Sequence, residues 1–247
     1  MTKKIFLAAL IFACAIAAPA VAQDQLTGMF RMTHTPIEAV GEEMAMSLNE
    51  SIPADQRLKW QMYVPETYNA ARPPGVFIFL DPNGYGGMPD QWRAVFENHN
   101  LIWVGPNTDN PRADESARLW HAIFGLRAVE QEYAIDLNRV YIGAAGSTAV
   151  TALNVQLNTN EIRGTIYMRT SVMWKSIKED RLEQLQRKRH VFITGTNDDA
   201  KARIRSDYES YQKAGIHGVK LIFDTQRIGK MPDPDHMDEA IRFLDGG

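Results

Sequence analysis

The sequence is poor in cysteine: it has one, Cys14, and this residue lies close to the N-terminus. Residues 1–22 show a basic start, an apolar run too short to cross a membrane, and an Ala-x-Ala cleavage site ending at Ala22, which together predict a secretory signal peptide. A lipoprotein signal at Cys14 is the alternative, which Phe12 two residues earlier fits poorly. Cleavage after Ala22 would remove the only cysteine, so the exported protein could form no disulfide bond. These features favour a periplasmic or secreted protein.

The sequence also lacks a basic block and, after the signal, any apolar run long enough for a membrane span. Loss of the signal lowers the basic residues from 27 to 25 against 30 acidic residues, a net charge of −5. We therefore expect no nucleic-acid partner and no membrane span. The remaining segment, 23–247, has the length of one α/β domain.

Apolar runs alternate with helical patterns along this segment. Residues 58–64 alternate apolar and polar side chains, as in a half-buried strand, whereas 76–80 is continuously apolar, as in a strand covered on both faces. The pattern predicts a single-domain, doubly wound, mostly parallel sheet with an antiparallel N-terminal edge. Further strands are expected at 27–35, 101–104, 139–142, 165–168, 191–194 and 219–223, and helices at 36–49, 91–99, 113–133, 149–153, 179–188, 201–214 and 235–244.

Ligands of such sheets bind at the carboxyl ends of the strands. The loops at 81–87, 107–110, 144–148 and 197–199 should therefore meet at one rim.

The stretch from Arg139 to Thr148 has an apolar run, then small residues, then the start of a helix. A strand, a tight turn and a helix in this order are typical of a nucleophile elbow, in which a serine is held exposed on a strained turn. The usual Gly-x-Ser-x-Gly motif is missing here. The elbow is therefore predicted without its usual nucleophile.

Several short motifs occur in the order seen in one family: Tyr63-Val64-Pro65, Leu101-Ile102-Trp103-Val104-Gly105, Tyr133-Ala134-Ile135-Asp136 before Arg139-Val140-Tyr141, and Arg242-Phe243-Leu244-Asp245. With them the chain resembles the α/β-hydrolases, and more narrowly the secreted esterases of the polyhydroxybutyrate-depolymerase type. The resemblance implies a serine nucleophile, an aspartate, a histidine and an oxyanion hole, in the chain order Ser, Asp, His.

The resemblance places the nucleophile on Gly146, with Ala145 or Ser147 in the neighbouring registers. Glycine adopts strained backbone geometry at little cost but supplies no nucleophile. Ser147 stays open to two interpretations, a hydroxyl near the helix start or a nucleophile in a turn shifted by one residue.

The resemblance places the acid on Asp198, with Asp199 one residue off, and the histidine on Gly229. Asp198 can also be a turn residue. Two histidines follow Asp198: His217, which precedes the last strand at the wrong end of the sheet, and His236, seven residues past the expected position. His34, His99, His121 and His190 belong to no motif and are interpreted as surface or packing residues.

The Gly-rich loop that would form the oxyanion hole corresponds to Gly84, Tyr85 and Gly86, with Gly87 after them. Backbone N–H groups can converge there. Asp81 stands where the resemblance implies a histidine, and a carboxylate next to a developing oxyanion is unfavourable.

Two functions follow from these residues. The first is an exported pseudoenzyme of the α/β-hydrolase fold that has lost its nucleophile and histidine and binds a small acyl or ester ligand or a partner. The alternative is a serine ester hydrolase that uses Ser147, Asp198 and His236. No cofactor or metal is predicted, because the glycines lack nucleotide-binding spacing and no His–Glu or His–Cys zinc spacing occurs.

Overall fold

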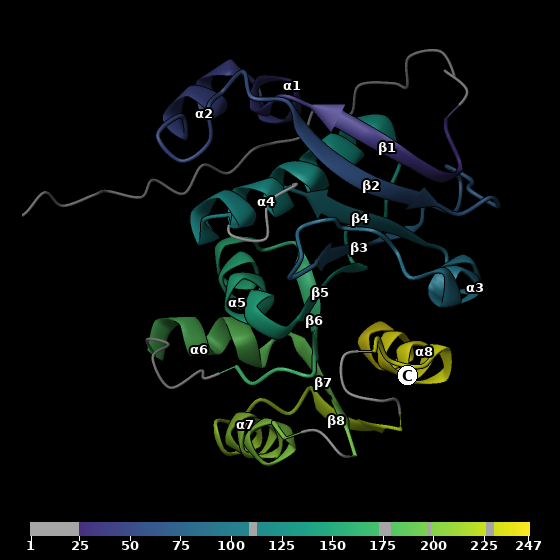
Figure 1. Ribbon diagram of the computed structural model, residues 1–247, viewed down its shortest axis with the longest axis vertical. Coiled ribbons are helices and arrows are strands. Elements are labelled where there is room, and N and C mark those ends of the chain that lie inside the picture. Colours follow the sequence, from purple (N-terminus) through teal and green to yellow (C-terminus); the bar gives the residue numbers. More distant parts are fainter. Residues whose placement is uncertain (1–24, 109–112, 173–178, 197–198, 226–229) are drawn as a thin grey trace, which may run out of the picture.

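The computed structural model describes residues 25–108, 113–172, 179–196, 199–225 and 230–247. The expected signal peptide, 1–22, lies outside these residues. Eight strands form one sheet in the order β1-β2-β4-β3-β5-β6-β7-β8 (Figure 1). The strands are β1 (Gly28–His34), β2 (Leu58–Val64), β3 (Gly75–Leu80), β4 (Leu101–Asn107), β5 (Val140–Ala145), β6 (Ile162–Met168), β7 (Arg189–Gly195) and β8 (Val219–Asp224).

The strands from β3 to β8 pair parallel with one another. Strand β2 pairs antiparallel with both of its neighbours, β1 and β4. This confirms the predicted mostly parallel sheet with an antiparallel N-terminal edge. The edge is two strands wide: β1 is outermost, and β2 lies between β1 and β4.

Helices cover both faces of the sheet, with α4 to α7 on one face and α3 and α8 on the other (Figure 1). Among the described residues, no helix is both long and apolar enough to cross a membrane. The α-helices are α1 (Pro36–Val40), α2 (Glu42–Ser47), α3 (Arg93–Asn98), α4 (Glu115–Glu132), α5 (Ala149–Asn158), α6 (Glu179–Gln186), α7 (Lys201–Lys213) and α8 (Pro234–Asp245), and the short 3-10 helices are η1 (Asp90–Trp92) and η2 (Gly146–Thr148).

Strand β3 shows why the sheet has two cores. All six of its residues are buried, and because side chains alternate along a strand, they divide between the two faces. Val76, Ile78 and Leu80 pack in the core beneath α4 and α5, whereas Phe77 and Phe79 pack on the side of α3 and α8. Burial on both faces explains the continuous apolar run in the sequence.

An aromatic cluster on the α3 side holds the loop after β3 in place. We call it the Trp103 cluster; it consists of Phe77, Phe79, Trp92, Phe96 and Trp103, all buried. The indole Nε1 of Trp103 donates to the carbonyl oxygen of Gly86 at 2.9 Å. The sheet interior is thereby linked to the rim on which the candidate site lies.

Candidate functional site at the carboxyl rim

The carboxyl ends of the parallel strands bring together the loops that the sequence analysis expected at one rim. The Thr148 hydroxyl, beyond the end of β5, donates to the carbonyl oxygen of Leu80 at 2.7 Å. The Thr108 N–H, just past β4, donates to the carbonyl oxygen of Gly84 at 2.9 Å. The loops after β3, β4 and β5 are therefore in contact. Residues 109–110 and 197–198 lie outside the described residues.

The turn between β5 and α5 has the geometry of a nucleophile elbow. Strand β5 ends at Ala145 in extended backbone, and Gly146 then has a φ of +55° at the start of η2. Of Ala145, Gly146 and Ser147, Gly146 alone has a positive φ. Gly146 is exposed, and a Cβ built on it would meet no atom within 4 Å. The residue at the strained position of the turn thus has room for a side chain and carries none.

Replacing Gly146 with alanine should lower the free energy of unfolding by about 1–2 kcal/mol, because a side chain in left-handed backbone is strained even where space is free. Gly87→Ala is the matched control: its Cβ also meets nothing within 4 Å, and its φ is not positive. Chemical denaturation of the two variants measures the difference. Equal losses would contradict a strained turn at Gly146.

Ser147 is exposed at the same turn. Among the described residues, no hydrogen bond joins it to an imidazole. Five of the described histidines have other neighbours: His34 contacts Glu132, His99 contacts Asp238, His121 contacts the Lys59 carbonyl, His190 contacts the Leu185 carbonyl, and His236 contacts Asp224. The sixth, His217, is exposed. A general base must lie within hydrogen-bond reach of its nucleophile, although this distance is often longer before substrate binds.

The loop expected to form the oxyanion hole directs its amides to a carboxylate of the protein itself. The Asp81 side chain accepts hydrogen bonds from the backbone N–H groups of Asn83 at 2.9 Å, Tyr85 at 3.1 Å and Gly86 at 3.2 Å. The Gly84 N–H donates to the Asp81 carbonyl oxygen at 3.0 Å. The Asp81 carboxylate thus occupies the donors that an oxyanion would need.

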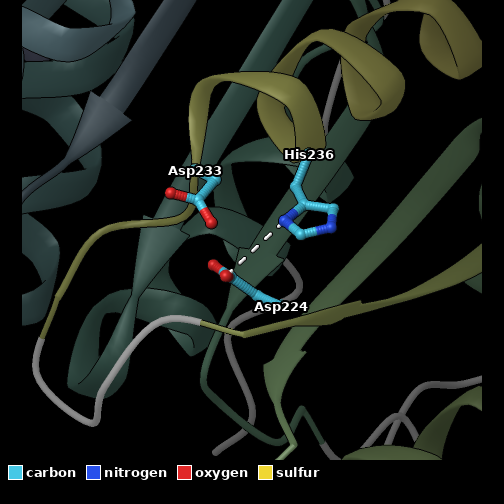
Figure 2. A group of neighbouring side chains, drawn as sticks. All are labelled: Asp224, Asp233 and His236. Atoms are coloured by element: carbon cyan, nitrogen blue, oxygen red, sulfur yellow. Dashed lines mark ion pairs between the residues drawn. The ribbon is translucent and has the colours of Figure 1, made fainter.

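His236 lies in the first turn of α8, and its imidazole points toward the end of β8 (Figure 2). Its Nδ1 lies 3.5 Å from Oδ1 of Asp224, the last residue of β8. Asp224 is 0 % exposed, and Asp233, three residues before His236, completes a group whose ligand atoms lie within 4.8 Å of one another. Asp198 and Gly229 lie outside the described residues, so their expected roles stay predictions.

No protein-family profile matches the chain. No curated protein is similar to it in sequence. Solved structures are similar in fold. A poly(3-hydroxybutyrate) depolymerase from Bordetella parapertussis superposes with a TM-score of 0.60 at 14% identity, over 90% of this chain and 91% of that one. The chain has the α/β-hydrolase fold.

Two further solved structures show the same likeness in fold. An S-formylglutathione hydrolase from Staphylococcus aureus gives a TM-score of 0.59 at 9% identity, over 91% of this chain and 97% of that one. A thermostable esterase gives 0.59 at 16% identity over 88% of this chain, which spans 62% of the esterase. The resemblance to esterases of this fold, seen in the sequence motifs, therefore extends to the architecture.

Arg169 and Thr170, which follow β6, lie between the turn at Gly146 and the group at β8, and no sequence pattern indicated the role of Arg169. Arg169 has a φ of +53°, unusual for a residue with a side chain. Its Nη2 lies 3.5 Å from Oδ2 of Asp224, and its Nε donates to the Lys230 carbonyl at 3.0 Å. The next residue, Thr170, donates from its hydroxyl to the Gly146 carbonyl at 2.8 Å.

Asp224 and Asp233 were also missed, although the sequence holds a signal for them. Asp224 directly follows the predicted strand 219–223, so it had to lie at the carboxyl rim. Asp233 lies two residues before the predicted helix 235–244, and His236 lies in its first turn, so both were expected near the start of that helix.

Proposed function

We propose that this protein is a non-catalytic member of the α/β-hydrolase fold that binds a small ligand or a partner at the carboxyl rim. The observation that carries the proposal is Gly146, which stands in the left-handed position of the elbow with free space around it. Glycine keeps the shape of the turn at little energetic cost and removes the attacking oxygen. In serine hydrolases, loss of a triad member lowers the rate by about 10⁴-fold or more.

Two further features support this proposal. The amides of Tyr85 and Gly86 donate to Asp81, so a tetrahedral intermediate would have to compete with a carboxylate for them. The imidazole of His236 lies beside Asp224, and no described hydrogen bond links it to Ser147. The nucleophile, the oxyanion donors and the general base that acyl transfer requires are thus each altered.

We further propose that residues 1–22 direct export to the periplasm or beyond, and that the ligand is a small acyl or ester compound. The fold supports the ligand class, because its similar structures include esterases. The carboxyl rim of the described residues has a small hollow lined by Leu80, Asp81, Gly84, Pro106, Thr108 and Arg118. The net charge of −5 expected after export disfavours nucleic acid.

The test is a fluorophosphonate probe together with p-nitrophenyl esters, applied to the exported protein and to Ser147→Ala. We expect no labelling, and the same background ester hydrolysis in both proteins. We also expect Gly146→Ser to remain inactive, since restoring a hydroxyl supplies neither oxyanion donors nor a base. Mass spectrometry of the intact chain and a spectrophotometric rate measure these outcomes.

The alternative is an active serine ester hydrolase with Ser147, Asp198 and His236. The exposure of Ser147 at the elbow and the esterases of similar fold favour it. Labelling that disappears in Ser147→Ala, together with ester turnover lost in the same variant, would establish this alternative and refute the non-catalytic proposal. Loss of that turnover in His236→Ala would then assign the base.

A further inference from the structure

Three side chains from two elements converge at the end of β8: Asp224 from the strand, and Asp233 and His236 from the start of α8 (Figure 2). From their chemistry and spacing, we propose that Asp224, Asp233 and His236 bind a divalent cation of the zinc class. The site is separate from the elbow and from the acyl-transfer residues considered above, except that the esterase alternative would use His236.

The distance between Asp224 and His236 suits two ligands of one ion better than a hydrogen bond. Nδ1 of His236 and Oδ1 of Asp224 are 3.5 Å apart, beyond the usual range of about 2.7–3.2 Å for an N–H···O bond. Two ligands at about 2.0–2.2 Å from a tetrahedral zinc ion lie about 3.3–3.6 Å from each other. Nδ1 of His236 is buried and makes no hydrogen bond within the described part of the chain.

The charges of the group suit a bound cation. Two carboxylates lie within 4.8 Å of each other, and one of them, Asp224, is 0 % exposed. A cation bound between two carboxylates is attracted by both of them. Nη2 of Arg169 lies 3.5 Å from Oδ2 of Asp224, the oxygen other than the one that faces His236. Arg169 can therefore orient the carboxylate for an ion bound on Oδ1, as outer groups do at metal sites.

The side chain of Asp233 is placed unusually for a residue at a helix N-cap. It is the N-cap residue of α8, and an aspartate there normally accepts a hydrogen bond from the first turn. Its side chain makes no such capping bond and lies near Asp224 and His236. A carboxylate oxygen of Asp233 therefore lies close enough to the other two side chains to share one ion with them.

The donor set selects among cations. One imidazole nitrogen and two carboxylate oxygens match Zn²⁺ or a similar transition metal, whereas Mg²⁺ and Ca²⁺ prefer oxygen ligands alone. His236 is 24% exposed, so an ion can reach the group from solvent and retain water as a further ligand.

The test is titration calorimetry of the exported protein, stripped with EDTA, with zinc chloride. We expect one saturable site per chain and a rise in melting temperature of about 5–10 °C at a free zinc concentration about 100 times the Kd. Magnesium and calcium chloride should bind at least about tenfold more weakly. His236→Gln and Asp233→Asn should each weaken zinc binding at least about tenfold.

The chain offers a matched control for each variant. His217 and Asp235 are exposed and lie outside the group, so His217→Gln and Asp235→Asn should leave zinc affinity unchanged. The absence of saturable binding to the unmodified protein would overturn the proposal, and so would equal zinc affinity in His236→Gln and its control. Asp224 and His236 would then form an ion pair only. Fluorophosphonate labelling is read separately, so either proposal can fail while the other stands.

Discussion

Replacing Trp103 with alanine is expected to lower the free energy of unfolding by about 3–5 kcal/mol, the cost of removing a large buried aromatic side chain. Trp103 is 0 % exposed and lies in β4, with ring centroids 4.9 Å from Phe79, 5.3 Å from Phe96, 5.8 Å from Phe77 and 6.1 Å from Trp92. The cavity would therefore open among four aromatic neighbours that strand and helix hold in place. Denaturation by guanidinium chloride, followed by circular dichroism, measures the loss.

Trp103→Phe is the matched control, because it keeps an aromatic ring and removes the Nε1 donor to the Gly86 carbonyl. We expect it to cost about 1–3 kcal/mol, less than the alanine variant, since a buried acceptor is left unsatisfied and part of the packing remains. Amide hydrogen exchange in 81–87 should rise in both variants, because the hydrogen bond fixes that loop. A loss below about 1 kcal/mol in Trp103→Ala would contradict the role of the Trp103 cluster.

Much of the fold can be predicted from the sequence because its strands are locally distinctive. The continuous apolar run at 76–80 reflects burial on both faces of the sheet, and the alternation at 58–64 reflects burial mainly on one face. Each pattern predicts a strand within one residue of the observed bounds. The predicted helix at 36–49 is instead two helices, α1 and α2. Gly41, with a φ of +82°, separates them, and apolar periodicity does not report this break.

The site is harder to predict because its contacts depend on backbone paths between elements. The resemblance placed the nucleophile position on Gly146, and in the structure this residue has a φ of +55°. The hydrogen bonds from the loop amides to Asp81 depend on a turn geometry that glycine content alone does not fix. Likewise, the contact of His236 with Asp224 depends on the path of the chain between β8 and α8. The contact of Arg169 with Asp224 requires the arginine side chain to extend from the end of β6 past β7 to the end of β8.

A polar network at the opposite, amino-terminal end of the sheet joins α8 to α3 and β5. The Asp245 carboxylate accepts two hydrogen bonds from Arg139, at 2.8 and 2.9 Å, and one from the Tyr141 hydroxyl at 2.6 Å. His99 lies between Asp238, at 2.8 Å from Nε2, and Asp245, at 3.6 Å from Nδ1. Burial alone would raise the pKa of Asp245, but its interactions with His99, Arg139 and Tyr141 lower that pKa well below the ordinary value. The Asp245 carboxylate raises the pKa of His99, against the effect of partial burial.

These opposite shifts predict a stability maximum between about pH 4 and pH 6.5, the ordinary pKa values of Asp and His. The contribution of Asp245 is present above its unfolded pKa and is lost as the pH falls through the lowered folded pKa. The contribution of His99 is present below its unfolded pKa and is lost as the pH rises through the raised folded pKa. Urea denaturation of the unmodified protein between pH 3 and pH 9 should show both losses.

Asp245→Asn should lower the free energy of unfolding by about 2–3 kcal/mol near pH 6, because it removes the negative charge that interacts with both Arg139 and His99. This loss is smaller than that of breaking a fully buried pair, since the Asp245 side chain is 25% exposed. The variant should flatten both limbs of the pH profile, because the raised pKa of His99 depends first on Asp245. His99→Gln should flatten the alkaline limb most, since the hydrogen bonds of Asp245 with Arg139 and Tyr141 persist. A profile of unchanged shape in Asp245→Asn would show that other groups set the pH dependence of this fold.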